Sequence, residues 1–396
     1  MTKIDPVKAP SINYYPMLDV LRASAAFLVL LGHTRNWIFT GIGEVDHPSL
    51  PLKLFWLITV LQHEAVVIFF VLSGFLVGGA LVNSIGKQSF DLVGYLIARF
   101  VRIYVVYGPA LVVTGLVFWV GSGLFRDFGG DTIRPLFSEE QMDFGGLRAA
   151  LCHIAGLQGF VCGTWKQNPA LWSLGYEWVL YLFAPAILGL LMMRGALSVR
   201  LAAIALLLCG AAATCTDFTD GAFWFAAWFL GVFASLVVRN VYLPLSAGLV
   251  GLATLVGAMS VARIQVISLL ETDTAIALGT ALIIACRPLV TLQLAPRFFS
   301  WAAGFSYSLY ATHVPLVFLT IAALQSINFP THKISPSPTA FFAFSICTII
   351  PLIFAYLFSI CTERHTEQLR SWLKVLFCKA APPGGPRSTI QGNFGF

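Results

Sequence analysis

Residues 17–33 read Met-Leu-Asp-Val-Leu-Arg-Ala-Ser-Ala-Ala-Phe-Leu-Val-Leu-Leu-Gly-His, an apolar run with two charges near its start and a histidine at its end. The expected span extends past the polar residues Thr34, Arg35 and Asn36 to Trp37 and Ile38. A helix needs ~20 predominantly apolar residues to cross the ~30 Å hydrocarbon core of a bilayer. The stretch therefore predicts a transmembrane helix over 17–38, and the charges within it need an explanation of their own.

The composition of the whole chain also indicates a membrane protein. Hydrophobic residues make up 58% of the 396 residues, charged residues make up 11%, and the mean hydropathy is +0.83. A soluble domain has ~45–50% apolar and ~25% charged residues. We therefore expect an all-α, polytopic integral membrane bundle of about ten transmembrane helices. The expected spans are 17–38, 54–82, 95–120, 171–193, 201–215, 221–238, 242–261, 274–286, 299–324 and 339–360, of which the fifth and eighth are short.

The distribution of Lys and Arg predicts which ends of these spans face the cytoplasm, because cytoplasmic segments are enriched in both residues. With the N-terminus inside, 16 of the 24 basic residues fall in inside segments. This balance predicts two cytoplasmic termini: residues 1–16, and a partly disordered tail at 363–396 after a membrane domain at 17–362. We expect no cleavable signal peptide, and the net charge of +6 requires no nucleic acid as a partner.

A long extracytoplasmic loop is expected at about 121–170. Its segment 147–160 is apolar but too short to span, which favours an interfacial or re-entrant helix. Cys152 and Cys162 lie in this loop, and they either pair, as cysteines can in an oxidising compartment, or remain free. The eight cysteines show no metal-ligand spacing, so no metal site is expected.

The first span carries three ionisable residues that stand out. A charge inside a span costs at least ~2.5–3.5 kcal/mol on insertion scales, so it suggests a functional site. Asp19 and Arg22 are three residues apart and can pair on one helix face. His33 follows about three turns later, on nearly the same face and ~16 Å further along the axis. The alternative is an interfacial histidine at a helix end, with Arg22 reaching the lipid headgroups.

The second and third spans add a small-residue pair and two arginines. Ser73 and Gly74 allow close helix packing, which explains them without any chemistry. Arg99 and Arg102 share one face at the cytoplasmic end of the third span. Either they anchor the helix at the positive side of the membrane, or their guanidinium groups form a clamp for an anionic ligand such as a phosphate.

The fourth and ninth spans hold a buried acid and a second histidine. Glu177 lies about two turns into its span and has no basic residue within a turn, so it needs a partner from another helix. His313 lies near the middle of the membrane, three residues after Tyr310. A structural, hydrogen-bonded histidine is the alternative to a functional one at this position.

Together these segments resemble the acyltransferase-3 family of integral membrane acyltransferases. Five short motifs in the family's order, spread over some 300 residues, carry the resemblance. The matching positions are Arg22 and His33 in the first span, Ser73, Gly74 and Phe75 in the second, Arg99 and Arg102 in the third, Trp172, Ser173, Leu174 and Glu177 in the fourth, and Tyr307, Ser308, Leu309, Tyr310 and His313 in the ninth. The chain resembles the standalone members, which lack a fused extracytoplasmic hydrolase-like domain.

The resemblance implies O-acylation, commonly O-acetylation, of an extracytoplasmic glycan or glycolipid. The implied donor is cytoplasmic acyl-CoA, most simply acetyl-CoA, the implied partners are this donor, the carbohydrate acceptor and membrane lipids, and the implied location is the bacterial inner membrane. The residues assigned to catalysis are His33, Glu177 and Arg22; those assigned to donor binding are Arg99, Arg102, Ser73, Tyr310 and His313; and those in supporting positions are Asp19, Trp172 and Ser173.

The expected topology suggests a mechanism. His33 would act as the general base, and Glu177, which lies at a similar depth, would orient it. Arg22 would contact the donor or hold Asp19, and the hydroxyls of Ser73 and Tyr310 would stabilise the oxyanion. A route through an acylated residue is an alternative.

Two other classes of protein fit the same residues. A transporter or flippase also places Arg, Glu and His inside a membrane as a relay. The chain shows no repeat between its halves, which argues against that class. A receptor or scaffold without chemistry is the second alternative, and it predicts that His33 can be replaced without loss of function.

Overall fold

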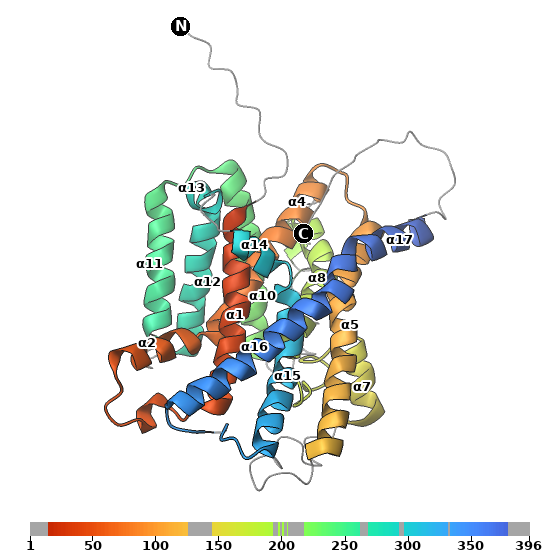
Figure 1. Cartoon of the computed structure of the whole chain (residues 1–396). Coiled ribbons are helices and arrows are strands. Elements are labelled where there is room, and N and C mark those ends of the chain that lie inside the picture. The colour runs from red at the N-terminus through yellow and green to blue at the C-terminus, as the bar shows by residue number, and fades with distance from the viewer. Residues whose placement is uncertain are drawn as a thin grey trace.

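The computed structural model describes residues 15–125, 145–192, 218–261, 268–292, 297–331 and 333–378, together with a few residues between 197 and 204. Within these residues the fold is all-α, and seven helical segments are long and apolar enough to cross a membrane (Figure 1). The predicted fold class, a polytopic membrane bundle, is confirmed. The helices are α1 (Pro16–Ile38), α2 (Leu50–Thr59), α3 (Gln62–Ser73), α4 (Gly79–Gly86), α5 (Leu92–Phe125), α7 (Gly146–Ile154), α8 (Trp172–Met192), α10 (Phe218–Asn240), α11 (Leu245–Val261), α12 (Leu269–Ala285), α13 (Arg287–Val290), α14 (Arg297–Ala303), α15 (Ser306–Ser326), α16 (Pro338–Cys361) and α17 (Thr366–Cys378).

Helices cover nine of the ten expected spans, and the remaining one, 201–215, lies almost wholly outside the described residues. α5 exceeds the expected third span, 95–120, by three residues at its start and five at its end, and at the eighth span α12 begins at Leu269 rather than at 274. Ser268 caps this helix: its hydroxyl accepts from the Glu271 N–H at 3.3 Å, and the Glu271 carboxylate accepts from the Ser268 N–H at 2.9 Å. This capping box extends the helix through two acidic residues, which a hydropathy window excludes.

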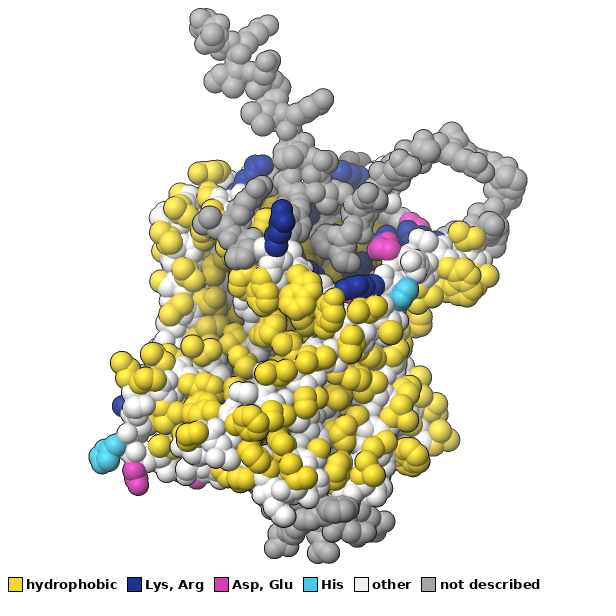
Figure 2. Space-filling view, in the orientation of Figure 1, with side chains coloured by type: hydrophobic (Ala, Val, Ile, Leu, Met, Phe, Trp, Pro, Cys, Tyr) yellow, Lys and Arg dark blue, Asp and Glu magenta, His cyan; other side chains and the backbone are white. Residues whose placement is uncertain are grey.

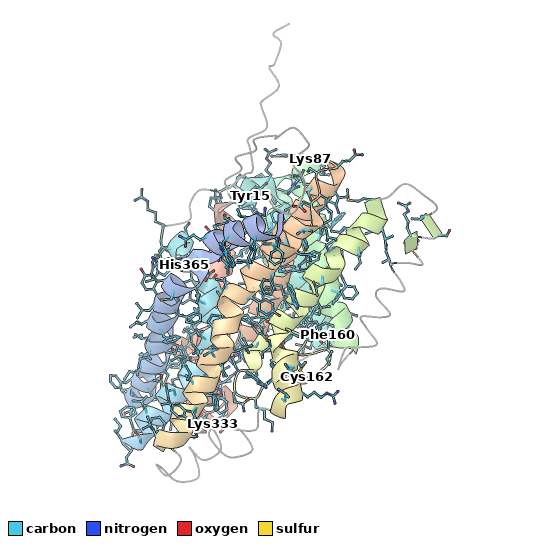
Figure 3. All side chains as sticks on the ribbon, turned by 90° about the vertical axis from the view of Figure 1, so that its right-hand side faces the viewer. Tyr15, Lys87, Phe160, Cys162, Lys333 and His365 are labelled. Carbon is cyan, nitrogen blue, oxygen red and sulfur yellow. A yellow bond between two sulfur atoms is a disulfide. The ribbon has the colours of Figure 1, made fainter. Side chains whose placement is uncertain are left out.

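The outer surface of the bundle suits a lipid environment. Figure 2 shows flanks covered by hydrophobic side chains, with Lys and Arg gathered at the end where α4 and α17 lie. We call this end the basic end. The opposite end, which carries α2 and α7, is called the disulfide end. In Figure 3, Tyr15, Lys87 and His365 lie at the basic end, and Phe160, Cys162 and Lys333 lie at the disulfide end.

Glycine lets two helices of the core meet at backbone contact. A Cβ added to Gly74 would collide with the carbonyl oxygen of Trp228 in α10, and one added to Gly231 would collide with that of Val71 in α3. Small residues permit this approach in membrane bundles. A π-helical turn, Gly74–Gly78, follows α3 directly. The close contact brings the Trp228 side chain to Ser73.

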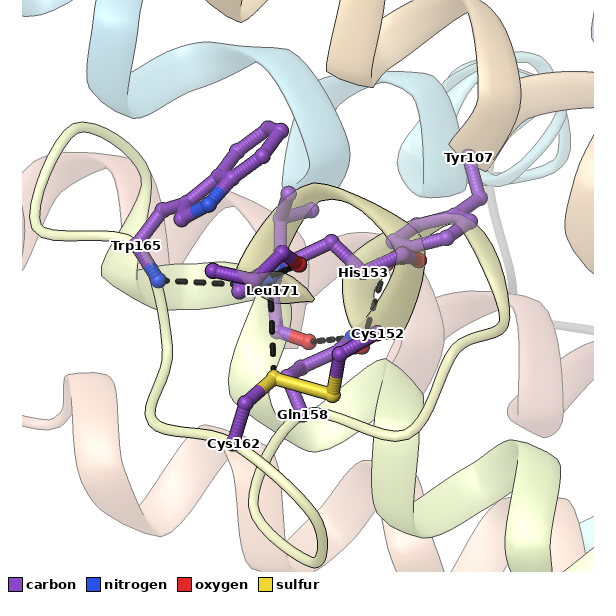
Figure 4. Close-up of a disulfide and its surroundings, with 8 residues drawn as sticks. Tyr107, Cys152, His153, Gln158, Cys162, Trp165 and Leu171 are labelled. Carbon is purple, nitrogen blue, oxygen red and sulfur yellow. Dashed lines mark hydrogen bonds between the residues drawn. A yellow bond between two sulfur atoms is a disulfide. The ribbon is translucent and has the colours of Figure 1, made fainter. Parts of the chain in front are cut away.

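At the disulfide end, Cys152 and Cys162 form a disulfide, with Cα atoms 6.4 Å apart (Figure 4). Between them lies His153, which is fully buried: its Nδ1 is 2.9 Å from the Ala149 carbonyl oxygen, and its Nε2 accepts from the Trp165 N–H at 3.1 Å. The segment therefore packs as a small covalently closed unit that begins with the short helix α7. A short helix was expected here, and of the two alternatives for the cysteines, pairing is the one found.

This unit is joined to the transmembrane helices by buried hydrogen bonds. The Tyr107 hydroxyl of α5 contacts the His153 carbonyl oxygen at 2.6 Å, and Gln158 donates to the Leu171 carbonyl oxygen at 2.9 Å (Figure 4). Asn168 donates to the Ala311 carbonyl oxygen in α15, also at 2.9 Å. The chain after the disulfide therefore fixes the start of α8 against α15.

Candidate active site

Polar side chains form a column through the bundle, beginning at a cavity at the basic end. The cavity has a volume of about 210 Å³. Arg22 donates to Asp19 at 2.7 Å, which confirms the predicted pairing on one face of α1. The cavity is lined by Arg22, Arg102, Ala303, Gly304, Glu363, Arg364, Thr366 and Glu367. Three guanidinium groups and two carboxylates face one small space, and the excess of one positive charge suits an anionic ligand.

Glu363 organises this end of the column, and the sequence interpretation missed it. Its carboxylate accepts from Arg102 at 3.2 Å and from the backbone N–H and hydroxyl of Ser308 at 3.2 and 3.0 Å. It lies in the short turn Glu363–His365 between α16 and α17. An acid among the basic residues after the last span is a weak signal, and nothing in the sequence relates it to α5 or α15.

The two arginines of α5 lie over aromatic rings. Arg99 lies 5.9 Å from the ring centre of Tyr95 and 5.6 Å from that of Tyr181, and Arg102 lies 5.3 Å from that of Tyr307. Such cation–π contacts hold a guanidinium group in place without neutralising it. Both arginines point into the bundle, and Arg102 also has a carboxylate partner.

Glu177 forms the next part of the column. Its Oε1 accepts hydrogen bonds from Ser73 at 2.9 Å and from the hydroxyl of Tyr181, while Trp228 Nε1 donates to Ser73 Oγ at 3.2 Å. The predicted partner from another helix is therefore Ser73 of α3. Because Ser73 donates its hydroxyl proton to Glu177, it is not placed to donate to an oxyanion, which was its expected role. Tyr181 and Trp228 were also missed, although Tyr181 is four residues after Glu177 and so on the same helix face.

The two histidines lie side by side further toward the disulfide end. The ring centres of His33 and His313 are 5.2 Å apart, and Tyr310 lies 6.0 Å from His313. The Tyr310 hydroxyl is 2.6 Å from Ser173 Oγ. His313 Nδ1 lies 2.8 Å from the Tyr310 carbonyl oxygen, which assigns the proton to Nδ1 and leaves Nε2 as an acceptor. This Nε2 is buried and has no hydrogen-bond partner among the described residues.

The structure thus differs from the expected pairing of His33 with Glu177. Glu177 bonds to Ser73 and Tyr181, and no His33–Glu177 hydrogen bond occurs within the described residues. The neighbour of His33 is His313, contributed by α15. Depth along the membrane normal does not specify which helices are adjacent, and α1 packs against α3, α14, α15 and α16.

The remaining supporting residue, Trp172, lies in an aromatic cluster. Its ring centre is 4.9 Å from that of Trp224, 5.7 Å from that of Tyr176 and 6.4 Å from that of Phe70. The cluster covers the column where α8 begins, next to Ser173. In the described part of the chain, no group of three or more His, Cys, Asp and Glu residues is arranged to hold a metal ion.

The fold and the column define a polytopic membrane protein with a buried polar site that extends from one end toward the other. Residues 15–357 match the family model of the acyltransferase-3 domain, so the chain belongs to this family of membrane acyltransferases. Over 133 residues the chain is 34% identical to an uncharacterized protein of Haemophilus influenzae. The aligned region covers 31% of this chain and 47% of that protein. The match thus spans about half of that relative's length. No solved structure matches the chain significantly.

Proposed function

We propose that the protein transfers an acyl group, most simply acetyl, from cytoplasmic acyl-CoA to a hydroxyl of an extracytoplasmic glycan or glycolipid. The observation that carries this proposal is the column itself, which runs from an arginine-lined cavity at one end to paired histidines nearer the other. A reaction whose donor and acceptor come from opposite sides of a membrane needs such an arrangement.

The cavity at the basic end suits the donor. Coenzyme A carries several phosphate charges, and guanidinium groups bind phosphate through paired hydrogen bonds. Arg22, Arg102 and Arg364 line the cavity, and Arg99 lies further in over Tyr181. The long pantetheine arm would follow the column past Glu177 and so bring the thioester to His33.

Two features support the orientation with the basic end in the cytoplasm, in a bacterial inner membrane. Lys and Arg gather at that end, as they do in cytoplasmic segments (Figure 2). The Cys152–Cys162 disulfide lies at the other end, and disulfides persist in oxidising compartments outside the cytoplasm. Both termini would then be cytoplasmic.

The histidine pair provides the chemistry for direct transfer. The acceptor hydroxyl oxygen attacks the thioester carbonyl carbon while His33 takes the hydroxyl proton. The tetrahedral intermediate collapses with cleavage of the C–S bond, and the departing thiolate recovers the proton from His33. His313 Nε2, an open acceptor beside His33, is suited to orient the base, the role first given to Glu177. The Tyr310 hydroxyl, which is 2.6 Å from Ser173 Oγ, would act as the oxyanion donor by turning its proton from Ser173 to the substrate.

Acetyl-CoA-dependent labelling of envelope glycans tests this proposal. We expect wild type to add acetyl groups and His33→Ala and Arg102→Ala to lose transfer at matched protein levels. His47→Asn is the matched control, because His47 is exposed and has a positive φ that asparagine tolerates. Full activity of His33→Ala would show that His33 is not the general base. A wild-type protein that neither binds acetyl-CoA nor acylates any glycan fraction would overturn the proposal.

A further inference from the structure

A second polar cluster lies at the disulfide end, outside the column. His63 Nε2 and Asp273 Oδ2 are 2.8 Å apart, and they join α3 to α12 across 210 positions of sequence. The Asp273 side chain is 6% exposed and the His63 side chain is 36% exposed. The second carboxylate oxygen, Asp273 Oδ1, is buried and has no hydrogen-bond partner among the described residues. A buried carboxylate oxygen is costly to leave without a donor, so a ligand that donates a hydrogen bond to this atom would be stabilised.

Local structure explains why an acid is held at this position. α12 begins at Leu269, so Asp273 lies in the second turn of the helix, close enough to its start to face His63 at the start of α3. α12 packs directly against α3 and α10. The carboxylate is therefore fixed by His63, and among the described residues only its Oδ2 has a hydrogen-bond partner.

An aromatic wall connects this pair to the reaction centre. The His63 ring lies 5.8 Å from Trp224, and Trp224 lies 4.9 Å from Trp172. Trp172 is followed by Ser173, whose hydroxyl meets that of Tyr310 beside the histidine pair. An aromatic wall would therefore extend from a ligand held at His63 and Asp273 to the site of acyl transfer.

The chemistry of the cluster fits a sugar. A carboxylate oxygen with a free lone pair accepts from hydroxyl groups, and tryptophan rings pack against apolar faces. An anionic group such as phosphate would be repelled by Asp273. We propose that Asp273, held in place by His63, binds a neutral, hydroxyl-bearing sugar unit of the acceptor. This inference rests on the proposed function, since it requires that the acceptor is a glycan.

The test separates acceptor binding from donor binding. The probe is the glycan fraction that wild type acylates, freed of its acyl groups and cut by mild acid into oligosaccharides. In Asp273→Asn and His63→Gln, we expect the KM for this probe to rise about ten- to a hundredfold, the effect of losing one hydrogen bond to a charged group. The KM for acetyl-CoA and the kcat at saturating probe should stay within about twofold of the wild-type values. This margin is well below the expected rise in the KM for the probe.

Glu271→Gln is the matched control. Glu271 lies two residues before Asp273 on the same helix, is exposed, and glutamine preserves its capping box with Ser268. Acetyl-CoA binding by each variant shows that it is folded, and either variant alone is sufficient for the test. An unchanged KM for the probe in a folded variant, or an equal rise in the KM for acetyl-CoA, overturns the inference while the proposed function stands. If wild type neither binds acetyl-CoA nor acylates any glycan fraction, the proposed function is overturned, and this inference with it.

Discussion

Glu363 accepts hydrogen bonds from Arg102 and Ser308 and thereby joins the last turn of the bundle to α5 and α15. Its side chain is 8% exposed, so removing its charge leaves Arg102 largely buried without its partner. We expect Glu363→Gln to lower the free energy of unfolding by about 1–3 kcal/mol, less than the ~3–5 kcal/mol of a fully buried pair because Arg102 is still partly exposed. Thermal unfolding in detergent measures the change.

Glu367→Gln provides the comparison for that measurement. Its partner is Arg370 at 3.1 Å, and its side chain is 52% exposed. Exposed pairs of this kind contribute ~0–1 kcal/mol. Equal losses of stability in the two variants would show that the Arg102–Glu363 pair has no special role in holding the basic end together.

Single residues also show what the sequence could and could not predict about the site. The Asp19–Arg22 pair follows from a spacing of three on a helix, so it was predictable. The contact between His33 and His313 joins α1 to α15, and local spacing carries no information about which helices become neighbours. The same reason hid Glu363. The motif residues were found, but their partners depend on the packing of the whole bundle.

At the scale of elements, hydropathy located the spans well, and its failures have identifiable causes. α12 was predicted to start too late because its first turns carry Glu271 and Asp273, although a capping box makes them helical. The ninth span, 299–324, is two helices, α14 and α15, separated at Gly304 and Phe305. Hydropathy averages over such a break, and only the backbone reveals it.

The disulfide-closed segment that begins with α7 should be sensitive to pH. Burial lowers the pKa of His153, and this effect outweighs the hydrogen bond to the Ala149 carbonyl oxygen. The unfolded histidine, with a pKa of ~6.5, then binds protons more readily than the folded one. The stabilising contribution is therefore complete above pH ~6.5 and is lost as the pH falls below it.

Reduction of the disulfide measures this loss. We expect Cys152–Cys162 to be reduced faster at pH 5 than at pH 7.5, after correction for the reductant's own pH dependence, because protonation of His153 breaks the hydrogen bond from the Trp165 N–H. His153→Gln should flatten the pH dependence, and His47→Asn should leave it as in wild type. The same pH response in His153→Gln would assign the effect to another group.

At the scale of the whole molecule, the proposed reaction requires a definite orientation. Acyl-CoA is cytoplasmic, so the cavity lined by Arg22, Arg102 and Arg364 must open to that side. The disulfide and the His63–Asp273 pair would then face the other side, where the acceptor is found. The positions of Lys and Arg predict this orientation from sequence, whereas the connection between the two ends emerges only when α1, α5, α8 and α15 are packed together.

Two cysteine variants test the orientation directly. Lys53 of α2 and Lys87 after α4 are both exposed, and they lie at the disulfide end and the basic end. We expect a membrane-impermeant maleimide to label Lys53→Cys in intact cells, and to label Lys87→Cys only after the membrane is opened, with the unsubstituted protein as the background. The reverse result would place the arginine-lined cavity outside the cytoplasm, away from any acyl-CoA. It would therefore contradict the proposed transfer from a cytoplasmic donor to an extracytoplasmic acceptor. Labelling of both variants in intact cells would instead show that Lys53 and Lys87 lie on the same side of the membrane, contrary to their positions at opposite ends of the bundle.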